Sequence, residues 1–369
     1  MELGDDMTKV DPIEQLRRRR LRSQLLSGPP ADSADAVVDH LLAVQAQDER
    51  GFRLAIRSRT RGLAAGDVDV ALNQGRLLVT WLNRGTLHLV RSEDYWWLHR
   101  LTAHRVLPGV RRRLRQLGVN VDDEERAVQI IIGALESEGP LNRYQLRDRI
   151  DAEGVTTEGQ ALVHLLAAAS LPGHVVRGPM TEGHHAFVAV EQWLGPGPPA
   201  PDYAEDLDRL VRRYLVGHAL AGPEDLAMWA GITVADARLA FAGAAADLLE
   251  MDAGSVLGPR RPGSPAPGPP QLLGPFDPVL HGWVSREPFV GQHRSVVTTN
   301  GIFRAACLVE GRVVGTWTQP SKGPIIRLLE DVDVSVRDVL AAEARDVSRF
   351  LGRGEGPVTF VDHAGDLSK

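Results

Sequence analysis

A repeated pattern in the middle of the chain restricts its possible folds more than any other sequence feature. Residues 139–161 (GPLNRYQLRDRIDAEGVTTEGQA) and 222–237 (GPEDLAMWAGITVADA) both read Gly-Pro, helix, Gly-aliphatic-Thr, helix. Proline suits the first turn of a helix, glycine commonly ends one, and a threonine hydroxyl can cap the next. We therefore expect Gly-Pro to open the first helix of each unit, and Thr156 and Thr233 to cap the second. The pattern predicts two helix-turn-helix units.

Residues typical of strands follow the first unit. Residues 174–179 (HVVRGP) and 185–190 (HAFVAV) read as two short strands around the polar loop MTEGH, which predicts a winged helix. The first 90 residues follow the same plan less regularly, with a hairpin over residues 77–90 that turns at Asn-Arg-Gly, residues 83–85. Before it we expect helices near residues 12–26, 33–47, 51–60 and 67–73.

The last third of the chain has a different pattern. Strands are expected from residues 282, 295, 303 and 312, with Glu310-Gly311 as a tight turn, before an amphipathic helix that starts at Val334. The predicted fold class is α+β, with tandem winged helix-turn-helix modules and a C-terminal antiparallel β-rich domain. Pro/Gly-rich stretches at 195–201 and 259–270 mark linkers or long loops. The expected divisions are residues 10–118, 119–200, 201–258 and 271–369.

Composition indicates a multidomain protein of the cytoplasm. The 369 residues are 43% hydrophobic, but no window reaches about 18 consecutive apolar residues, so we expect no contact with a membrane. The N-terminus begins with acidic residues and has no apolar segment typical of a signal peptide. Cys307 is the single cysteine, which excludes an internal disulfide and any multi-cysteine metal site and fits a reducing compartment.

The net charge of −6 is unevenly distributed. Residues 1–118 contain 20 Lys and Arg against 14 Asp and Glu, a net of +6, and the remainder carries −12. Much of the positive charge lies in RRRR at 17–20 and RRRLR at 111–115. Two interpretations stay open: helices whose arginines are solvated on one face, or a stripe that faces DNA phosphates, with Arg111, Arg112 and Arg113 as candidates.

Several familiar chemistries are excluded by missing motifs. The chain has no phosphate-binding loop, no H-E-x-x-H, no G-x-S-x-G and no dinucleotide-binding fingerprint after a strand. The adjacent pair His184-His185 would point to opposite faces of a strand and makes a poor chelate. We therefore expect no metal and no cofactor.

The order of several motifs along the chain resembles a known family. The stretches LLAVQAQD, RLLVTWLNRGTLHLV, TEGQALVHLLAAA, LLGPFDPVLHGW and NGIFRAACLVEGRVVGTW, among others, resemble the winged-helix DNA-binding family that includes the AlkZ-like DNA glycosylases. The resemblance covers nearly the whole chain. It departs from the family at residues 277–281 (DPVLH), where Asp-Glu-Tyr-Leu-Leu is frequent, and at residues 305–307 (AAC), where Pro-Thr-Val is common.

The resemblance implies a catalytic role for two glutamines. In the family, a Gln-hydrophobic-Gln motif in the first module acts at an alkylated nucleotide, and it corresponds here to Gln45 and Gln47. Alkylation makes a purine a good leaving group, so the enzyme needs only to position water and tolerate a cationic sugar, which amide carbonyls can do. Residues two apart share a face only in extended chain, so the helix must end before the pair. Alternatively, the glutamines merely finish a helix.

Other residues are candidates for assisting or for DNA contact. Asp48 and His88 are placed to assist, with Asp48 as a base. Arg84 at the hairpin turn is a candidate for a phosphate contact, and Thr86 alternates with His88 onto one face of the returning strand. Asn300 and Arg304 are further candidates for DNA contact in the C-terminal part.

Three functions stay open at this point. The leading hypothesis is a monomeric, monofunctional glycosylase that hydrolyses the N-glycosidic bond of alkylated purines, including bulky adducts or interstrand crosslinks, in double-stranded DNA. The alternatives are a non-catalytic winged-helix DNA binder or regulator, and a scaffold that binds protein. The sequence does not identify the natural lesion, nor distinguish general repair from self-resistance to an alkylating toxin.

Overall fold

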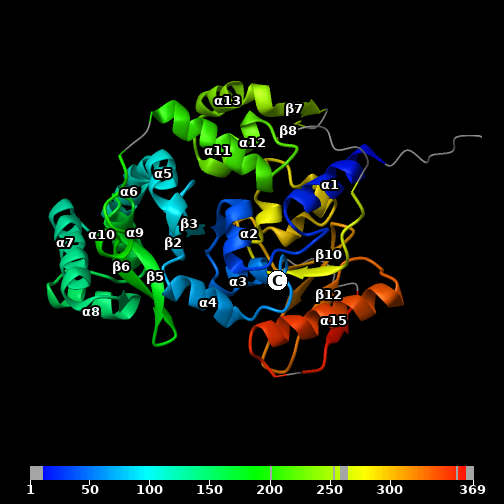
Figure 1. The fold of residues 1–369 in the computed structure, drawn as a ribbon. Helices are drawn as coiled ribbons and strands as arrows, with labels where there is room; N and C mark the ends of the chain where they lie inside the picture. The colour runs from blue at the N-terminus through cyan, green and yellow to red at the C-terminus, as the bar shows by residue number, and fades with distance from the viewer. Residues whose placement is uncertain (1–10, 200–201, 252–253, 258–264, 355, 363–369) are drawn as a thin grey trace, which may run out of the picture.

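Two β-sheets and the helices around them organise the protein. The computed structural model describes residues 11–199, 202–251, 254–257, 265–354 and 356–362. In Figure 1 helices α7 to α10 lie on the left, α11 to α13 at the top and α15 at the lower right, around the first helices in the middle. The protein is mixed α and β, and strand pairing is antiparallel except between β12 and β13.

The first sheet has six strands in the order β1-β3-β2-β5-β6-β4. The two predicted hairpins form its centre and are confirmed, and the neighbouring strands β2 and β5 meet at Val79 and Arg177. Residues expected in separate modules therefore share one sheet. The strands are β1 (Val44–Gln45), β2 (Leu77–Leu82), β3 (Thr86–Arg91), β4 (Leu141–Asn142), β5 (Val175–Thr181) and β6 (His184–Ala189).

Helices precede and follow these strands. The N-terminal helices agree with the expected ones except that the second ends early. The helices are α1 (Pro12–Ser23), α2 (Ala34–Leu41), α3 (Glu49–Arg57), α4 (Ala65–Asn73), α5 (Ser92–Thr102), α6 (Leu107–Gln116), α7 (Val121–Glu138), α8 (Arg143–Ala152), α9 (Ala161–Ser170) and α10 (Val190–Leu194).

The two repeated units fold as helix pairs but start differently. In the second unit Pro223 opens α12 (Pro223–Ala230), and the Thr233 hydroxyl accepts the Asp236 N–H at the start of α13 (Val234–Gly243), as predicted. In the first unit Gly139-Pro140 leads into strand β4, and Asn142 caps α8. The prediction that Thr156 caps α9 is wrong, because a turn intervenes and α9 begins at Ala161.

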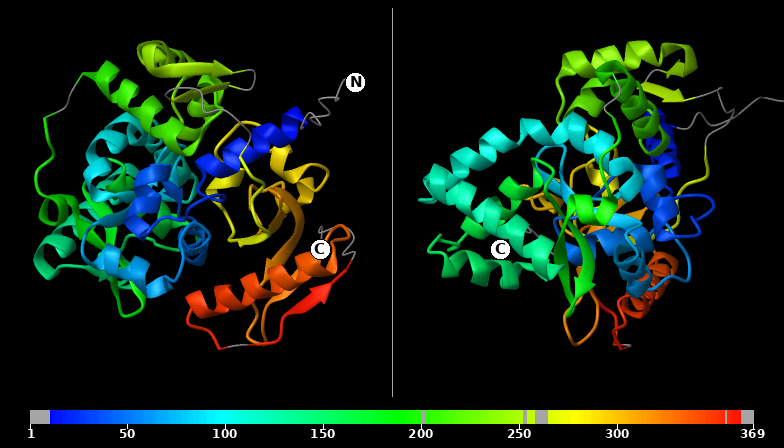
Figure 2. Two further views of the ribbon diagram at one scale, coloured as in Figure 1. Left: turned by 45° about the vertical axis from the view of Figure 1, so that its right-hand side comes forward. Right: turned by 60° about the vertical axis from the view of Figure 1, so that its left-hand side comes forward.

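The third group of helices ends in a small hairpin. Helix α11 (Tyr203–Gly217) packs against α13, and β7 (Leu248–Met251) pairs with β8 (Gly254–Leu257). Figure 2 shows this group at the opposite end of the molecule from α15.

The C-terminal sheet has the order β13-β12-β11-β10-β9 and is covered by α15 (Val334–Phe350). The turn at Glu310-Gly311 and the closing helix are confirmed, but strands expected from residues 282 and 295 are wrong. The first contains α14 (Glu287–Val290) and the second begins with a short 3-10 helix, because Phe289, Val290 and Val296 pack into the core without a strand partner. The strands are β9 (Gln271–Leu273), β10 (Ala306–Val309), β11 (Arg312–Thr318), β12 (Ile325–Leu328) and β13 (Thr359–Val361).

Two arginines of the RRRR run are structural, so neither interpretation of that run holds for them. Arg17 is buried and donates to the carbonyl oxygens of Glu310 and Pro288. Arg20 is buried, donates to the Leu220 carbonyl and lies 4.4 Å from the centroid of the Trp283 ring. Helix α1 thus holds the C-terminal part against the third group of helices. No helix within the described ranges is long and apolar enough to cross a membrane.

Candidate active site

The Gln45–Gln47 stretch is not helical, because helix α2 ends at Leu41 rather than at residue 47. Gln45 is the last residue of strand β1, and the chain bends at Gln47 before α3 begins at Glu49. Leu42 has a φ of 68°, which takes the chain out of the helix, and Val44 is fully buried where β1 pairs with β3. The apolar pattern continues through this stretch, but pairing with the sheet outweighs it. The condition that the helix ends before the glutamines is therefore met.

Gln45 lies opposite His88 in the pairing of β1 with β3. The Ala46 N–H donates to the Leu87 carbonyl at 2.7 Å, so Gln45 and His88 form a pair without backbone hydrogen bonds of its own. Side chains at such positions share one face and lie about 5 Å apart at Cβ. Both residues are buried, with exposed fractions of 8% and 5%. The sheet thus places a neutral amide directly beside an imidazole.

The carboxamide of Gln45 is available to a ligand. Among the described residues none hydrogen-bonds to it, although 8% of the residue stays accessible. Gln47 is exposed and likewise has no side-chain partner in the part of the chain that the structure describes. Since buried amides normally find partners, an unpartnered one at a reachable position is suited to bind water or substrate.

Asp48 begins helix α3. Its Oδ1 accepts the Gly51 N–H at 2.7 Å, so this carboxylate oxygen caps the helix. The C-terminal part approaches at the same place: a Cβ on Gly51 would lie 2.5 Å from the Pro275 carbonyl oxygen. Glycine at position 51 therefore allows residues 274–276 to lie against the end of the glutamine stretch.

His88 is held as a neutral ring with a defined tautomer. Its Nδ1 donates to the Thr86 carbonyl at 2.9 Å, which leaves Nε2 as an acceptor. Burial, and to a smaller extent the Arg84 charge, lower the pKa of His88 to about 4. At neutral pH it can accept a hydrogen bond at the site.

The tip of the first hairpin packs against helix α12. Asn83 and Gly85 have positive φ values of 54° and 85°, and a Cβ on Gly231 would lie 2.7 Å from the Asn83 carbonyl oxygen. Arg84 is exposed and its guanidinium contacts the Met228 sulfur. Thr86 is half-buried with its hydroxyl enclosed and unpartnered among the described residues. Arg84 can thus be reached by DNA more readily than Thr86.

The remaining candidates for DNA contact lie on two other surfaces. Arg111, Arg112 and Arg113 are exposed on α6, where Arg111 pairs with Glu124 at 3.0 Å and Arg113 donates to the side-chain Oε1 of Gln160 at 2.9 Å. Asn300 is exposed in a turn closed by the Thr298 N–H bond to the Ile302 carbonyl, and Arg304 is half-buried beside it. The structure therefore does not gather all the candidates at one point.

The structure adds residues that sequence reasoning missed. His281 forms a cluster with the rings of Phe276 and Phe303, at centroid distances of 6.1 and 3.8 Å, and the two phenylalanine rings are 5.9 Å apart. Arg286 lies over Phe303, with its guanidinium carbon 5.2 Å from the ring centroid. Burial, and then the Arg286 charge, lower the pKa of Arg84. Burial, and then Arg84, His88 and Arg286, lower the pKa of His281. The only sequence signal was that residues 277–281 depart from the family pattern.

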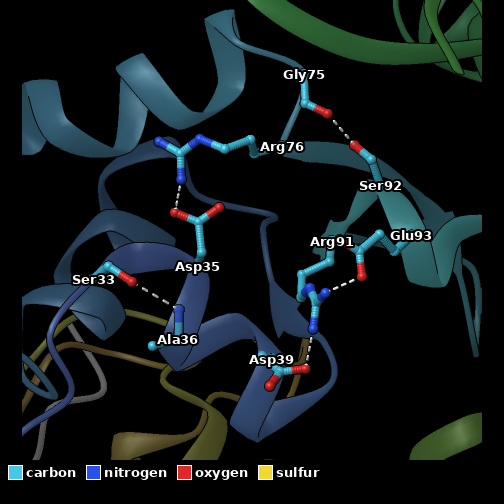
Figure 3. A pocket seen from close by; sticks show the side chains of 9 residues that line it. All are labelled: Ser33, Asp35, Ala36, Asp39, Gly75, Arg76, Arg91, Ser92 and Glu93. Atoms are coloured by element: carbon cyan, nitrogen blue, oxygen red, sulfur yellow. Dashed lines mark hydrogen bonds and ion pairs between the residues drawn. The ribbon is translucent and has the colours of Figure 1, made fainter.

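A separate hollow of about 550 Å³ lies on α2, β3 and the start of α5 (Figure 3). Its charged side chains are paired with one another: Arg76 with Asp35, and Arg91 with both Asp39 and Glu93. Neither Gln45 nor Gln47 lines it. In the described part of the chain no three His, Cys, Asp or Glu residues are grouped as metal ligands would be.

Comparison with known proteins identifies the family of this chain. A curated relative, the interstrand DNA cross-link repair glycosylase of Streptomyces sahachiroi, is 25% identical over 364 residues, covering 93% of this chain and 97% of the relative. The solved structure of the S. sahachiroi DNA glycosylase AlkZ superposes with a TM-score of 0.75 at 23% identity, over 94% of this chain and 99% of that one. The model of the family described as "DNA glycosylase AlkZ-like" matches residues 38–353. The chain belongs to the AlkZ-like family of DNA glycosylases.

Proposed function

We propose that this DNA glycosylase hydrolyses the N-glycosidic bond of alkylated purines, with Gln45 and Gln47 as catalytic residues. The observation that carries the proposal is the Gln45 carboxamide, which is buried in β1 yet bonded to no described residue. The proposal is supported by the position of both glutamines outside a helix, since β1 includes Gln45 and α3 begins only at Glu49, and residues two apart can share a face when the chain is not helical. Both amides could then meet one water or one sugar.

The chemistry needs little from titrating groups. An alkylated purine carries a positive charge and leaves as a neutral base, so no strong acid has to protonate it. Two amide oxygens can accept hydrogen bonds from one water and favour the positive charge that develops on the sugar. His88 Nε2 supports this arrangement as a further acceptor beside Gln45, because its tautomer is fixed by Thr86.

The substrate class extends to bulky lesions. The S. sahachiroi relative is described as an interstrand cross-link repair glycosylase, and the family match covers the part of this chain that contains both glutamines. We propose that crosslinked purines are among the substrates. The exposed position of Gln47 supports this, because a site with an open side leaves room for a bulky or tethered base.

We further propose that the chain acts as a monomer in which three winged-helix modules grip the duplex. The modules span residues 10–118, 119–200 and 201–258, with residues 271–369 as the β-rich domain. Each helix pair is followed by a hairpin: β2–β3, β5–β6 and β7–β8, respectively. Sedimentation of the free protein and of its DNA complex tests the monomer.

The test is base release from duplex DNA that contains 7-methylguanine. Wild type should release free base and leave alkali-labile sites, and Gln45→Ala and Gln47→Ala should each lower the single-turnover rate by at least about 100-fold while still binding DNA. Gln292→Ala is the matched control, because Gln292 is exposed and no described residue bonds to its side chain. Wild-type rates in both glutamine variants would remove them from catalysis, and binding without base release by wild type would indicate a non-catalytic DNA binder.

A further inference from the structure

Four nitrogen-containing side chains lie around the first hairpin, and one of them, His88, is opposite Gln45 in the sheet. Arg84 comes from the first hairpin, His88 from β3, and His281 and Arg286 from the C-terminal segment. Arg286 lowers the pKa of Arg84, after burial, and Arg84, His88 and Arg286 all lower the pKa of His281, again after burial. Helix α12 connects the two arginines in space: the Val284 N–H, two residues before Arg286, donates to Asp225 Oδ1 at 2.8 Å, and the Arg84 guanidinium contacts Met228 on the same helix. The two guanidinium groups therefore lie at one surface, where their positive charges repel each other.

The carboxylates that adjoin this cluster in the sequence are used elsewhere. Asp277 bonds the guanidinium of Arg59, and Glu287 pairs with Arg294 at 3.2 Å. Arg84 and Arg286 form no ion pair with any residue of the described ranges. The positive charge of the cluster thus has no counterion among the residues that the structure describes.

Aromatic rings hold the C-terminal members in place. His281 is stacked on Phe276 with an angle of 10° between the rings, and Phe303 lies against both His281 and Arg286. Phe276 adopts a φ of 57°, which is unusual for a residue with a side chain, and its N–H donates to the Phe303 carbonyl at 3.3 Å. Such strain is found at sites where geometry is functional.

Two polar atoms of the cluster are enclosed and have no partner. His281 is 94% buried by its exposed fraction of 6%, and its Nε2 bonds to nothing in the described part of the chain. The Nε of Arg286 is likewise enclosed without a partner there. A buried polar atom without a hydrogen-bond partner is unfavourable, and a ligand that hydrogen-bonds to it removes that cost.

We propose that Arg84, Arg286 and His281 form a binding site for a DNA phosphodiester next to the damaged nucleotide. This inference rests on the proposed function, because it takes Gln45, which lies opposite His88, as the site of the damaged nucleotide. A phosphate would offset the repulsion between the two guanidinium groups and accept from their N–H donors in a partly desolvated setting, where such bonds are strong. It would fix the strand so that the glycosidic bond meets Gln45 and Gln47.

The test uses duplex DNA that contains a tetrahydrofuran abasic analogue, so that binding is measured without catalysis. A series of duplexes replaces one phosphate at a time, on either side of the analogue, by a neutral methylphosphonate. The wild-type protein should bind more weakly to the duplex in which the phosphate at one particular position has been replaced. Arg286→Gln should weaken binding of the unmodified duplex and reduce the slope of log affinity against log salt by about 1. Its affinity should no longer change when the phosphate at that position is replaced, while the effects of replacement at the other positions stay as in wild type.

Three further variants complete the design. Arg84→Gln should give the same change of profile as Arg286→Gln and carries the test if Arg286→Gln melts at a clearly lower temperature. His281→Leu should weaken the response at the same position without changing the salt slope, since the ring is neutral when free. Arg345→Gln is the control, because Arg345 is exposed on α15 and is not part of the cluster, and it should keep the wild-type profile.

Each outcome is decisive. A wild-type profile in both Arg84→Gln and Arg286→Gln would overturn the proposal. A melting temperature of wild type that rises with inorganic phosphate at constant ionic strength, together with no methylphosphonate effect, would assign the cluster to free phosphate and also overturn it. Base release from 7-methylguanine DNA, measured in parallel, separates the two claims, since failed excision with an intact methylphosphonate profile counts against the proposed hydrolysis alone.

Discussion

Arg59 and Asp277, 218 residues apart in the sequence, form a two-point ion pair in which both side chains are fully buried. The Arg59 guanidinium nitrogens donate to the Asp277 oxygens at 2.9 and 2.8 Å and also to the Ala55 and Gln24 carbonyls. Asp277 directly follows Phe276, the residue whose ring is stacked on His281, and Arg59 lies just after the end of α3. The pair therefore fixes the C-terminal segment against the module that contains the glutamines.

Removal of Asp277 should be strongly destabilising. Asp277→Ala leaves the Arg59 charge buried without its partner, which typically costs about 3–5 kcal/mol. Glu287→Ala breaks the exposed pair with Arg294 and should change stability by less than about 1 kcal/mol. Urea unfolding of both variants measures the difference. Equal stabilities would mean that the interior around Arg59 is reached by water.

Gly231→Ala should disturb both stability and the hairpin tip. Gly231 has a φ of 70° and no room for a Cβ beside the Asn83 carbonyl, whereas Gly154, which follows α8, has a φ of 76° and open space around it. Gly154→Ala should lose about 1–2 kcal/mol for the left-handed backbone alone. Gly231→Ala should lose more and also slow base release, because Arg84 would move. Thermal unfolding and excision rates test this, and equal losses would argue against tight packing at the tip.

The arginines of α6 and α1 should behave differently in DNA binding. Replacement of Arg111, Arg112 and Arg113 together by glutamate should weaken binding to undamaged duplex and flatten its salt dependence, because phosphate contacts release counterions. Arg20→Gln should lower stability and leave the salt slope of the folded protein unchanged, because Arg20 is buried against Trp283. DNA-binding titrations at several salt concentrations measure both effects. If the slope of log affinity against log salt is unchanged in the triple variant, the DNA does not contact these three arginines.

Stability should fall as the pH drops below about 6.5, the value of an unfolded histidine. Burial lowers the pKa of His88 to about 4 and of His185 and His218 to about 3, so the unfolded chain binds protons that the folded chain cannot. Their contribution is complete above about pH 6.5 and is lost as the pH falls towards 4, at up to about 1.4 kcal/mol per pH unit for each group.

The pH effect can be assigned to one ring by substitution. His185 is buried and packs at 5.8 Å from the Phe52 ring, so His185→Phe should keep the packing and make the loss of stability on acidification less steep. His184→Phe is the control on the neighbouring, exposed position. Urea unfolding at pH 7 and pH 5 compares them. If the stability of His185→Phe depends on pH as that of wild type does, the lowered pKa of His185 is not a cause of the acid sensitivity.

Local patterns predicted the elements that local interactions determine. Asn83, Gly85 and Glu310-Gly311 have the positive φ values that tight turns require, and Thr233 caps its helix. Where tertiary contacts override propensity the predictions were wrong: the helix before Gln45 ends early because β1 pairs with β3, and residues 287–290 form a helix although the sequence has strand character. The tandem winged-helix arrangement and its boundaries stay a prediction.

Only some of the residues of the candidate site could be predicted from the sequence. Gln45, Gln47 and Arg84 follow from motif and turn, and their roles stay predictions. His281 and Arg286 could not be found that way, because nothing local indicates that a segment more than half the chain away lies beside β3. Arginine runs were also ambiguous, since Arg17 and Arg20 turn inward while Arg111 to Arg113 do not.

The close approach of Pro275 to Gly51 has a consequence for biosynthesis. During translation the glutamine stretch leaves the ribosome before residues 274–303 are made, so the nascent protein has neither Pro275 against Gly51 nor the Arg286–Phe303 contact. The site is complete only when the last third of the chain has docked. A truncated translation product would therefore contain both glutamines and still be unable to hold a damaged strand against them.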